Sequence, residues 1–126
     1  MKLLIQCLAV AVGGSLGAVL RFLVATLCGR WFGTGFPIGT FAINITGSLF
    51  LGWFLTVIQQ RFTISDTLRV AVAVGVVGAY TTFSTFAYES HALLEDGAGL
   101  KAMFNMFGSV LLGLVAVRLG IMLGGR

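Results

Sequence analysis

Four apolar stretches, separated by short polar loops, dominate this sequence. They are Leu3–Leu27, Ile38–Ile58, Thr67–Ala92 and Lys101–Leu123. About 20 apolar residues suffice for a helix to cross the hydrocarbon core of a bilayer. The composition agrees, because 10% of the residues are charged, against roughly 25% in a soluble domain. We therefore predict an all-α membrane protein with four transmembrane helices in one domain, residues 1–126.

The stretch Gly75–Glu89 interrupts the apolar pattern of the third predicted span. Gly78 is followed, within residues 80–86, by five hydroxyl side chains and two phenylalanines three residues apart, namely Tyr80, Thr81, Thr82, Ser84, Thr85, Phe83 and Phe86. Irregular polar backbone survives at membrane depth only where protein buries it or where it lines a water-filled path. A continuous helix could satisfy one or two hydroxyls by bonding them to its own backbone. Five hydroxyls instead favour a broken helix, and broken membrane helices commonly build ion sites.

The first span combines a face of small residues with one charge. Gly13 and Gly17 lie four residues apart, as do Gly14 and Ala18, and this spacing predicts a flat face for close helix packing. Arg21 follows one turn later, inside the apolar run, where a charge is costly unless it snorkels, pairs or faces water. Two interpretations of Arg21 stay open: snorkelling to the interface, and an electropositive vestibule that collects anions.

The second and fourth spans each contain an asparagine within their apolar sequence, Asn44 and Asn105. Thr40 precedes Asn44 by one helical turn, so both lie on one face. A buried amide needs hydrogen-bond partners. Asn44 is therefore either an interhelical contact or a donor to a permeating anion in a pore lining. Asn105, Ser109 and Gly113 recur every four residues on the fourth span, which favours close packing or a polar lining.

Two local patterns concern the ends of the spans. Thr63 to Asp66 has the spacing of a capping box, with Asp in place of Glu, and predicts the start of the third helix at Thr63. Cys7 and Cys28 are the only cysteines. On one helix they would lie about 30 Å apart, beyond the reach of a disulfide, so we predict that both are free.

The basic residues barely choose an orientation for these spans. The side with the termini carries five of them and the other side three: Lys2, Arg61, Arg69, Arg118 and Arg126, against Arg21, Arg30 and Lys101. Positive residues in loops orient membrane proteins, so a weak bias predicts insertion both ways and antiparallel pairing of two copies. The alternative is that this bias suffices to fix one topology.

Three motifs resemble the CrcB or Fluc family of small fluoride channels. They are Gly13-Gly-Ser-Leu-Gly-Ala-Val-Leu-Arg21, Gly39-Thr-Phe-Ala-Ile-Asn44 followed by Gly47, and Gly78-Ala-Tyr-Thr-Thr-Phe-Ser-Thr-Phe86. The resemblance covers essentially the whole chain, and the third motif is its specific signal. Ala79-Tyr80 departs from the smaller or less polar pair expected in the family, which leaves the shape of the break open.

The resemblance implies a fluoride-selective channel that exports fluoride passively and lowers its cytoplasmic concentration. It implies a multi-pass, antiparallel, dual-topology homodimer in the inner (plasma) membrane, with two pores. A structural sodium ion would lie at the dimer centre, held by the backbone carbonyls of Gly78 and Thr81. The expected pore residues, with Arg21 at a vestibule, are Asn44, Phe83, Phe86, Ser84, Thr85, Ser109 and Thr40.

The expected chemistry suits a small anion. A dry pore must replace the strong hydration of fluoride with donors, which hydroxyl and amide groups supply. Aromatic ring edges carry partial positive charge and can also contact an anion. Glu89 lies either near a pore mouth or as a carboxylate at the membrane interface.

Two other functional classes fit less well. A dual-topology multidrug exporter would have the same size, but proton-coupled export needs an embedded carboxylate, and the first, second and fourth spans contain no Asp or Glu. An enzyme is not expected, because the chain has one His, no metal-ligand cluster and no nucleophile beside a base.

Overall fold

Long apolar stretches become long helices here, because a helix satisfies its own backbone in a medium without water. A computed structural model describes all residues 1–126, and every regular element is helical. The elements are α1 (Lys2–Phe32), α2 (Ile38–Gln60), α3 (Asp66–Val70), η1 (Ala71–Val77), α4 (Gly78–Tyr80), α5 (Phe83–Glu95) and α6 (Gly99–Gly124). The elements α3 to α5 together form the third span. Four segments are long and apolar enough to cross a membrane, which confirms the predicted number of spans.

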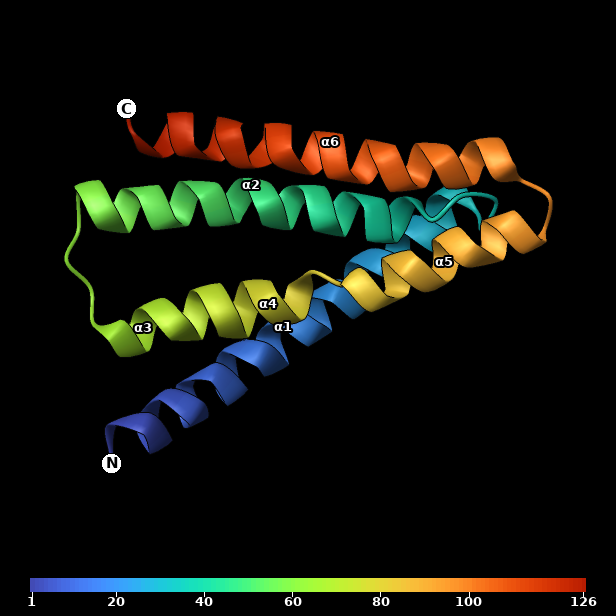
Figure 1. The fold of residues 1–126 in the computed structure, drawn as a ribbon. Coiled ribbons are helices and arrows are strands. Elements are labelled where there is room, and N and C mark those ends of the chain that lie inside the picture. Colours follow the sequence, from blue (N-terminus) through green and yellow to red (C-terminus); the bar gives the residue numbers. More distant parts are fainter.

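The third span is broken, as predicted (Figure 1). Its first half contains a π-helical segment, η1, and ends with the short α4. Thr81 (φ −78°, ψ 156°) and Thr82 (φ −149°, ψ 116°) are extended. The helix resumes at Phe83 as α5. Two successive residues of the hydroxyl-rich stretch therefore leave the helical conformation at the middle of the span.

The start of the third span differs from the prediction. Ser65 rather than Thr63 caps the helix, and its hydroxyl accepts a hydrogen bond from the Leu68 N–H at 3.2 Å. Asp66 does not reach back to close a capping box, because its carboxylate pairs with Lys2 Nζ at 2.9 Å. The capping-box prediction was thus wrong by two residues, because the cap at Ser65 makes Asp66 the first residue of the helix and not the third.

The first span is longer than predicted. The sequence placed its end at Leu27, but α1 continues to Phe32. Gly33 then adopts a positive φ of 75°, a conformation that glycine tolerates and that commonly ends helices. The helix thus continues for five residues beyond the predicted end of the span.

Glycines bring α1 into backbone contact with the first half of the third span. A Cβ added to Gly13 would overlap the Ala71 carbonyl oxygen, and one added to Gly17 would overlap that of Val76. The face of small residues predicted on the first span is therefore confirmed as a packing face. The same device joins α2 to α6, where Gly52 and Gly120 leave no room for a side chain.

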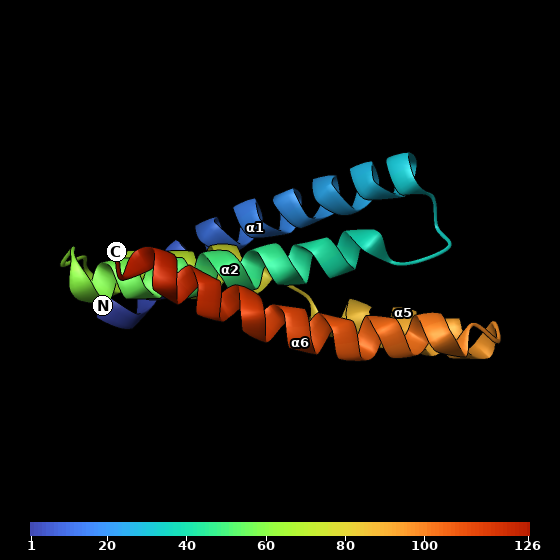
Figure 2. The same cartoon turned by 90° about the horizontal axis from the view of Figure 1, so that it is seen from above.

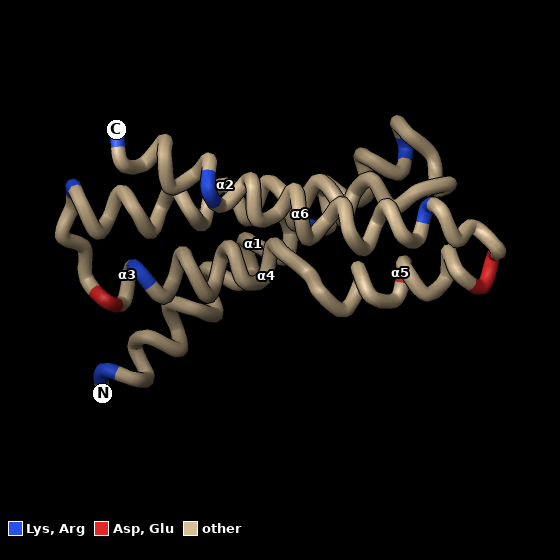
Figure 3. The backbone as a smooth tube through the Cα atoms, turned by 45° about the horizontal axis from the view of Figure 1, so that its top comes forward, with Lys and Arg blue, Asp and Glu red and all other residues tan.

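The bundle is thin and exposes most of its apolar side chains. Both termini lie at one end (Figure 1), and α1 diverges from α5 and α6 toward the other end (Figure 2). Only 16 of 126 residues are buried, so lipid or a partner must cover the rest. More Lys and Arg residues lie at the end with the termini than at the other end, and the acidic residues Glu95 and Asp96 lie where α5 ends, at the opposite tip (Figure 3). Both cysteines are free, as predicted.

Candidate functional site

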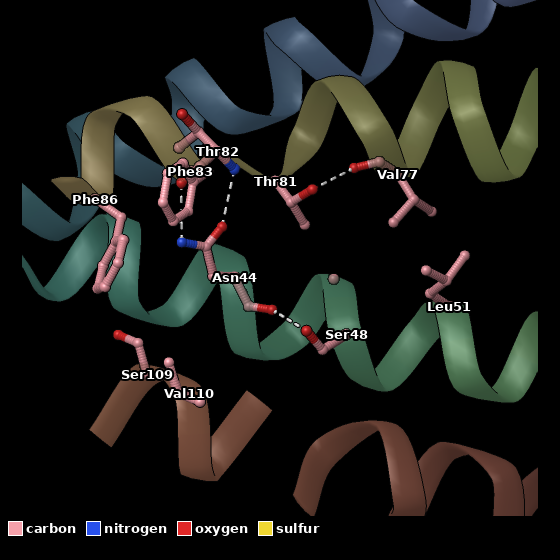
Figure 4. Close-up of a pocket in the computed structure, with 11 residues that line it drawn as sticks. Asn44, Ser48, Leu51, Val77, Thr81, Thr82, Phe83, Phe86, Ser109 and Val110 are labelled. Carbon is pink, nitrogen blue, oxygen red and sulfur yellow. Dashed lines mark hydrogen bonds between the residues drawn. The ribbon is translucent and has the colours of Figure 1, made fainter. Parts of the chain in front are cut away.

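A cavity of about 320 Å³ opens beside the break of the third span. It lies between α2, the two halves of the third span and α6 (Figure 4). Its lining comprises Asn44, Gly47, Ser48, Leu51, Val77, Thr81, Thr82, Phe83, Phe86, Ser109 and Val110. Four of the predicted pore residues therefore come together here: Asn44, Phe83, Phe86 and Ser109.

The side-chain amide of Asn44 holds the unwound backbone. Its Nδ2 donates to the Thr82 carbonyl at 3.1 Å, and its Oδ1 accepts from the Thr82 N–H at 2.8 Å (Figure 4). Asn44 is thus an interhelical contact, one of the two interpretations left open by the sequence. An amide nitrogen has two hydrogens, so one donor remains for a ligand in the cavity.

The Thr82 side chain starts α5 after the break. Its Oγ1 accepts from the Thr85 N–H at 3.3 Å and lies 2.9 Å from the Thr85 hydroxyl, to which it donates. This is the usual role of a threonine at an N-cap. The Thr85 hydroxyl is therefore engaged, and Thr85 and Ser84 lie outside the cavity lining. The sequence did not single out Thr82 as a cap.

These contacts remove the helical partners of two carbonyl groups. In a continuous helix the Thr82 N–H would bond to the Gly78 carbonyl and the Thr85 N–H to the Thr81 carbonyl. Here Asn44 Oδ1 takes the first N–H and Thr82 Oγ1 takes the second. Gly78 and Thr81 consequently carry carbonyl oxygens without their i+4 donors.

Phe83 and Phe86 lie together at the opening of the cavity. Their ring centroids are 5.8 Å apart, with the planes inclined by 46°. Phe86 is half-buried, whereas Phe83 is 78% exposed. Phe83 therefore lines the cavity and is also exposed on the outside of the chain.

The cavity has one buried hydroxyl without a partner. Ser109 Oγ is inaccessible and makes no hydrogen bond. The Ser48 hydroxyl, by contrast, donates to the carbonyl of Asn44 at 2.7 Å and is satisfied within its own helix. A hydroxyl carries one donor hydrogen, so Ser109 can donate to a bound species and Ser48 cannot without losing its bond.

A second cavity, of about 290 Å³, lies at the end of the bundle away from the termini. Thr40 Oγ1 donates to Glu89 Oε1 at 3.0 Å, and both residues line this cavity. The other carboxylate oxygen, Glu89 Oε2, is buried without a partner. Thr40 therefore belongs to a different cavity from Asn44, although both lie on one face of α2.

Asn105 ties α6 to α5 between the two cavities. It is fully buried, and its Nδ2 donates to Ser90 Oγ at 2.9 Å. Ser90 in turn donates to the carbonyl of Phe86 at 2.7 Å. The periodic polar face of the fourth span thus includes a helix contact at Asn105 and a cavity hydroxyl at Ser109. The sequence did not single out Ser90.

Arg21 lies apart from both cavities. It is half-buried on α1 and has neither an ion pair nor a hydrogen bond. Neither cavity includes it in its lining. Its role at a vestibule stays a prediction.

Known proteins align with nearly the whole length of this chain. Residues 8–121 match the family described as CrcB-like protein, Camphor Resistance (CrcB). Three relatives named fluoride-specific ion channel FluC are similar to the chain. The one from Chloroflexus aurantiacus is 46% identical over 117 residues, which are 93% of each chain. The one from Methylococcus capsulatus is 47% identical over 94% of this chain and 52% of its own. The one from Nitrobacter winogradskyi is 45% identical over 90% of each.

The family match includes both cavities and the break between α4 and α5, since all their residues fall within 8–121. The identity to the relatives extends over the four spans and not over a single motif. The resemblance noted in the three motifs is therefore confirmed, and the chain belongs to the CrcB family.

Proposed function

We propose that this protein is a fluoride-selective ion channel, and not an enzyme, that lets fluoride leave the cell down its gradient. The observation that carries the proposal is the cavity at the helix break, which combines free donors with aromatic edges and contains no acidic side chain. The names of the relatives support the choice of ion.

The donors of the cavity suit a small, dehydrated anion. The Ser109 hydroxyl and the second N–H of Asn44 have no protein partner. Phe83 and Phe86 line the same space, and their ring edges carry partial positive charge. Selectivity in such a track comes from its width together with the donors that line it. Chloride is larger and gains less from the same donors.

We infer that the ion moves between the two cavities along α2 and α5. Asn44 and Thr40 are one turn apart on α2, and Phe86 and Glu89 are three residues apart on α5. Residues at these spacings share a helix face. Fluoride would pass from the Asn44 cavity to the Thr40 cavity across this face.

The channel is proposed to be an antiparallel homodimer in the inner membrane. Phe83 is largely exposed and Gly78 is exposed at the break, so a second copy on this face would close the cavity. The end with the termini carries five basic residues and one acidic residue, while the opposite half carries three of each (Figure 3). Antiparallel pairing would give both membrane faces the same charge.

The residues at the break fit a structural sodium ion on the two-fold axis. Sodium prefers oxygen ligands, and unwound backbone supplies them in other discontinuous helices. The carbonyls of Gly78 and Thr81 have lost their helical donors to side chains. A bound cation would neutralise these carbonyl dipoles of both copies and join them at the centre.

Reconstitution into liposomes tests the channel function. With the purified protein in vesicles loaded with fluoride or chloride salts, we expect rapid fluoride efflux, little chloride efflux and no need for a proton gradient. Equal leak of both anions would contradict the proposal.

Topology can be tested separately. A single cysteine introduced at Ala98, in the turn before α6, in a variant without Cys7 and Cys28, should react with an impermeant reagent from both sides of the membrane. Labelling from one side only would contradict the antiparallel dimer.

A further inference from the structure

The break of the third span is fastened to α2 on both sides. After the break, Thr82 is held by the Asn44 amide. Before the break, the phenol oxygen of Tyr80 lies 3.0 Å from Thr46 Oγ1. Asn44 and Thr46 are two residues apart on α2, and Tyr80 and Thr82 flank Thr81. Contacts to α2 thus lie on either side of Thr81, whose carbonyl is one of the two proposed sodium ligands.

The direction of the Tyr80 hydrogen bond follows from the other contacts of Thr46. The Thr46 hydroxyl donates to the Ala42 carbonyl at 2.7 Å, within its own helix. A hydroxyl has one hydrogen, so Thr46 Oγ1 can only accept from Tyr80. Tyr80 is the donor, and phenylalanine in its place would remove that donor without altering the ring.

The backbone of α2 is shaped to receive this segment. A Cβ added to Gly47 would overlap the methyl group of Thr81 and lie 3.3 Å from Tyr80 Cδ1. Gly47 therefore allows Tyr80 and Thr81 to lie directly on α2, and Thr46 beside it supplies the acceptor. Tyr80 itself does not line the cavity, so it acts on the backbone and not on the permeating ion.

We propose that the hydrogen bond from Tyr80 to Thr46 positions the end of α4, and with it the Gly78 and Thr81 carbonyls and the start of α5. This inference rests on the proposed function, since the carbonyls matter there as sodium ligands. The π-helical segment η1 precedes α4 directly, and α4 itself is only three residues long. So short an element spans less than one helical turn, and the side-chain contact from Tyr80 to α2 fixes its position.

The chain offers a matched control, because it has only one other tyrosine. Tyr88 is 75% exposed and makes no hydrogen bond. Tyr80→Phe and Tyr88→Phe thus make the same chemical change, but only the first removes a contact. Thr46→Val removes the acceptor, whereas Thr46→Ser retains it and serves as the conservative rescue.

The experiment compares these variants as purified full-length protein in liposomes, with fluoride efflux measured over a range of sodium concentrations. We expect Tyr80→Phe and Thr46→Val to slow efflux severalfold and to raise severalfold the sodium concentration for half-maximal efflux, while the oligomer remains intact. The double variant should be no worse than either single one, and Thr46→Ser and Tyr88→Phe should behave like the parent.

Hydrogen exchange of the backbone amides of residues 81–83 separates this inference from the proposed function. We expect faster exchange in Tyr80→Phe and Thr46→Val than in Tyr88→Phe, whether or not the parent carries fluoride. Unchanged exchange would overturn the inference. So would a Tyr80→Phe protein whose efflux and sodium dependence equal those of an active parent, or losses that multiply in the double variant. A parent that carries no fluoride contradicts the channel function alone.

Discussion

The glycine-packed helix pairs and the break of the third span satisfy the same membrane constraint in opposite ways. In the pairs, each backbone keeps its own hydrogen bonds, and glycines such as Gly17 and Gly120 let two backbones touch. At the break, the backbone gives up helical bonds, and the side chains of Asn44 and Thr82 replace them. Packing therefore depends on the absence of side chains, while the site depends on particular ones.

The largest expected effect comes from adding one carbon atom to a packed pair. Gly17→Ala would place a Cβ on the carbonyl oxygen of Val76, and backbone on both sides leaves nothing flexible to move. Overpacking typically costs about 1–3 kcal/mol, and we expect the upper end or complete loss of folded protein. Thermal unfolding and the yield of monodisperse protein measure this loss of stability.

The matched control is Gly29→Ala. Gly29 lies on the same helix, but a Cβ there meets nothing within 4 Å. Alanine is a better helix former than glycine, so this variant should be unchanged or slightly more stable. If Gly17→Ala folds as well as Gly29→Ala, close backbone packing is not what holds α1 to the third span.

The second effect concerns the amide that holds the break. Asn44→Asp keeps an acceptor for the Thr82 N–H but loses the donor to the Thr82 carbonyl. Leaving a buried group unpaired costs about 1–3 kcal/mol, and about 1.4 kcal/mol in a barrier is tenfold in rate. We expect fluoride efflux to fall by about tenfold or more, while the oligomer still assembles.

Ser48→Ala is the control for this prediction. Ser48 lines the same cavity, but its hydroxyl is satisfied by its own helix. We expect little change in efflux. If Asn44→Asp carries fluoride like Ser48→Ala, then the Asn44 amide is neither a needed donor nor a needed clamp.

The four spans, the glycine packing face and the position of the break could be predicted from the sequence. Length and hydropathy define the four spans, and the spacing of Gly13 and Gly17 predicts a packing face. The hydroxyls after Gly78 predict the break. These are local patterns, and local physics decides them: a helix needs apolar length, and hydroxyls need partners.

The pairing of Asn44 with Thr82 could not be predicted, because the two residues are 38 positions apart and their contact depends on how α2 lies against the break. The same limit applies to the position of Ser84, a predicted pore residue that lies outside the lining of this cavity. Two extended residues change the rotation of α5 relative to α4, so helical periodicity cannot be carried across the break. Phe83 and Phe86 line the cavity, but Ser84 between them does not.

The third prediction concerns these two phenylalanines. Phe83→Ile and Phe86→Ile keep apolar bulk but remove the ring edges that would contact an anion. If the rings only pack, the change should cost less than about 1.5 kcal/mol of stability and spare transport. We expect efflux to fall severely in both variants, with the oligomer intact. The exposed Phe107 on α6 provides the control, since Phe107→Ile should transport normally. Normal transport by both cavity variants would exclude aromatic contacts with fluoride.

The smallest expected effect distinguishes two N-cap side chains, one that only stabilises a helix and one that also shapes the site. Ser65 caps the third span at its start, as Thr82 caps α5 at the break, and each accepts the N–H three residues on. Losing such a cap costs about 1 kcal/mol. Ser65→Ala should therefore lower the free energy of unfolding by about that amount and leave fluoride efflux unchanged, because no carbonyl near the cavity depends on it. Thr63→Ala should change neither the free energy of unfolding nor fluoride efflux, since Thr63 is not the cap. Thr82→Ala should lower both stability and efflux. Equal effects of Ser65→Ala and Thr82→Ala on efflux would mean that the side chains at the break maintain the helix and do not build the site.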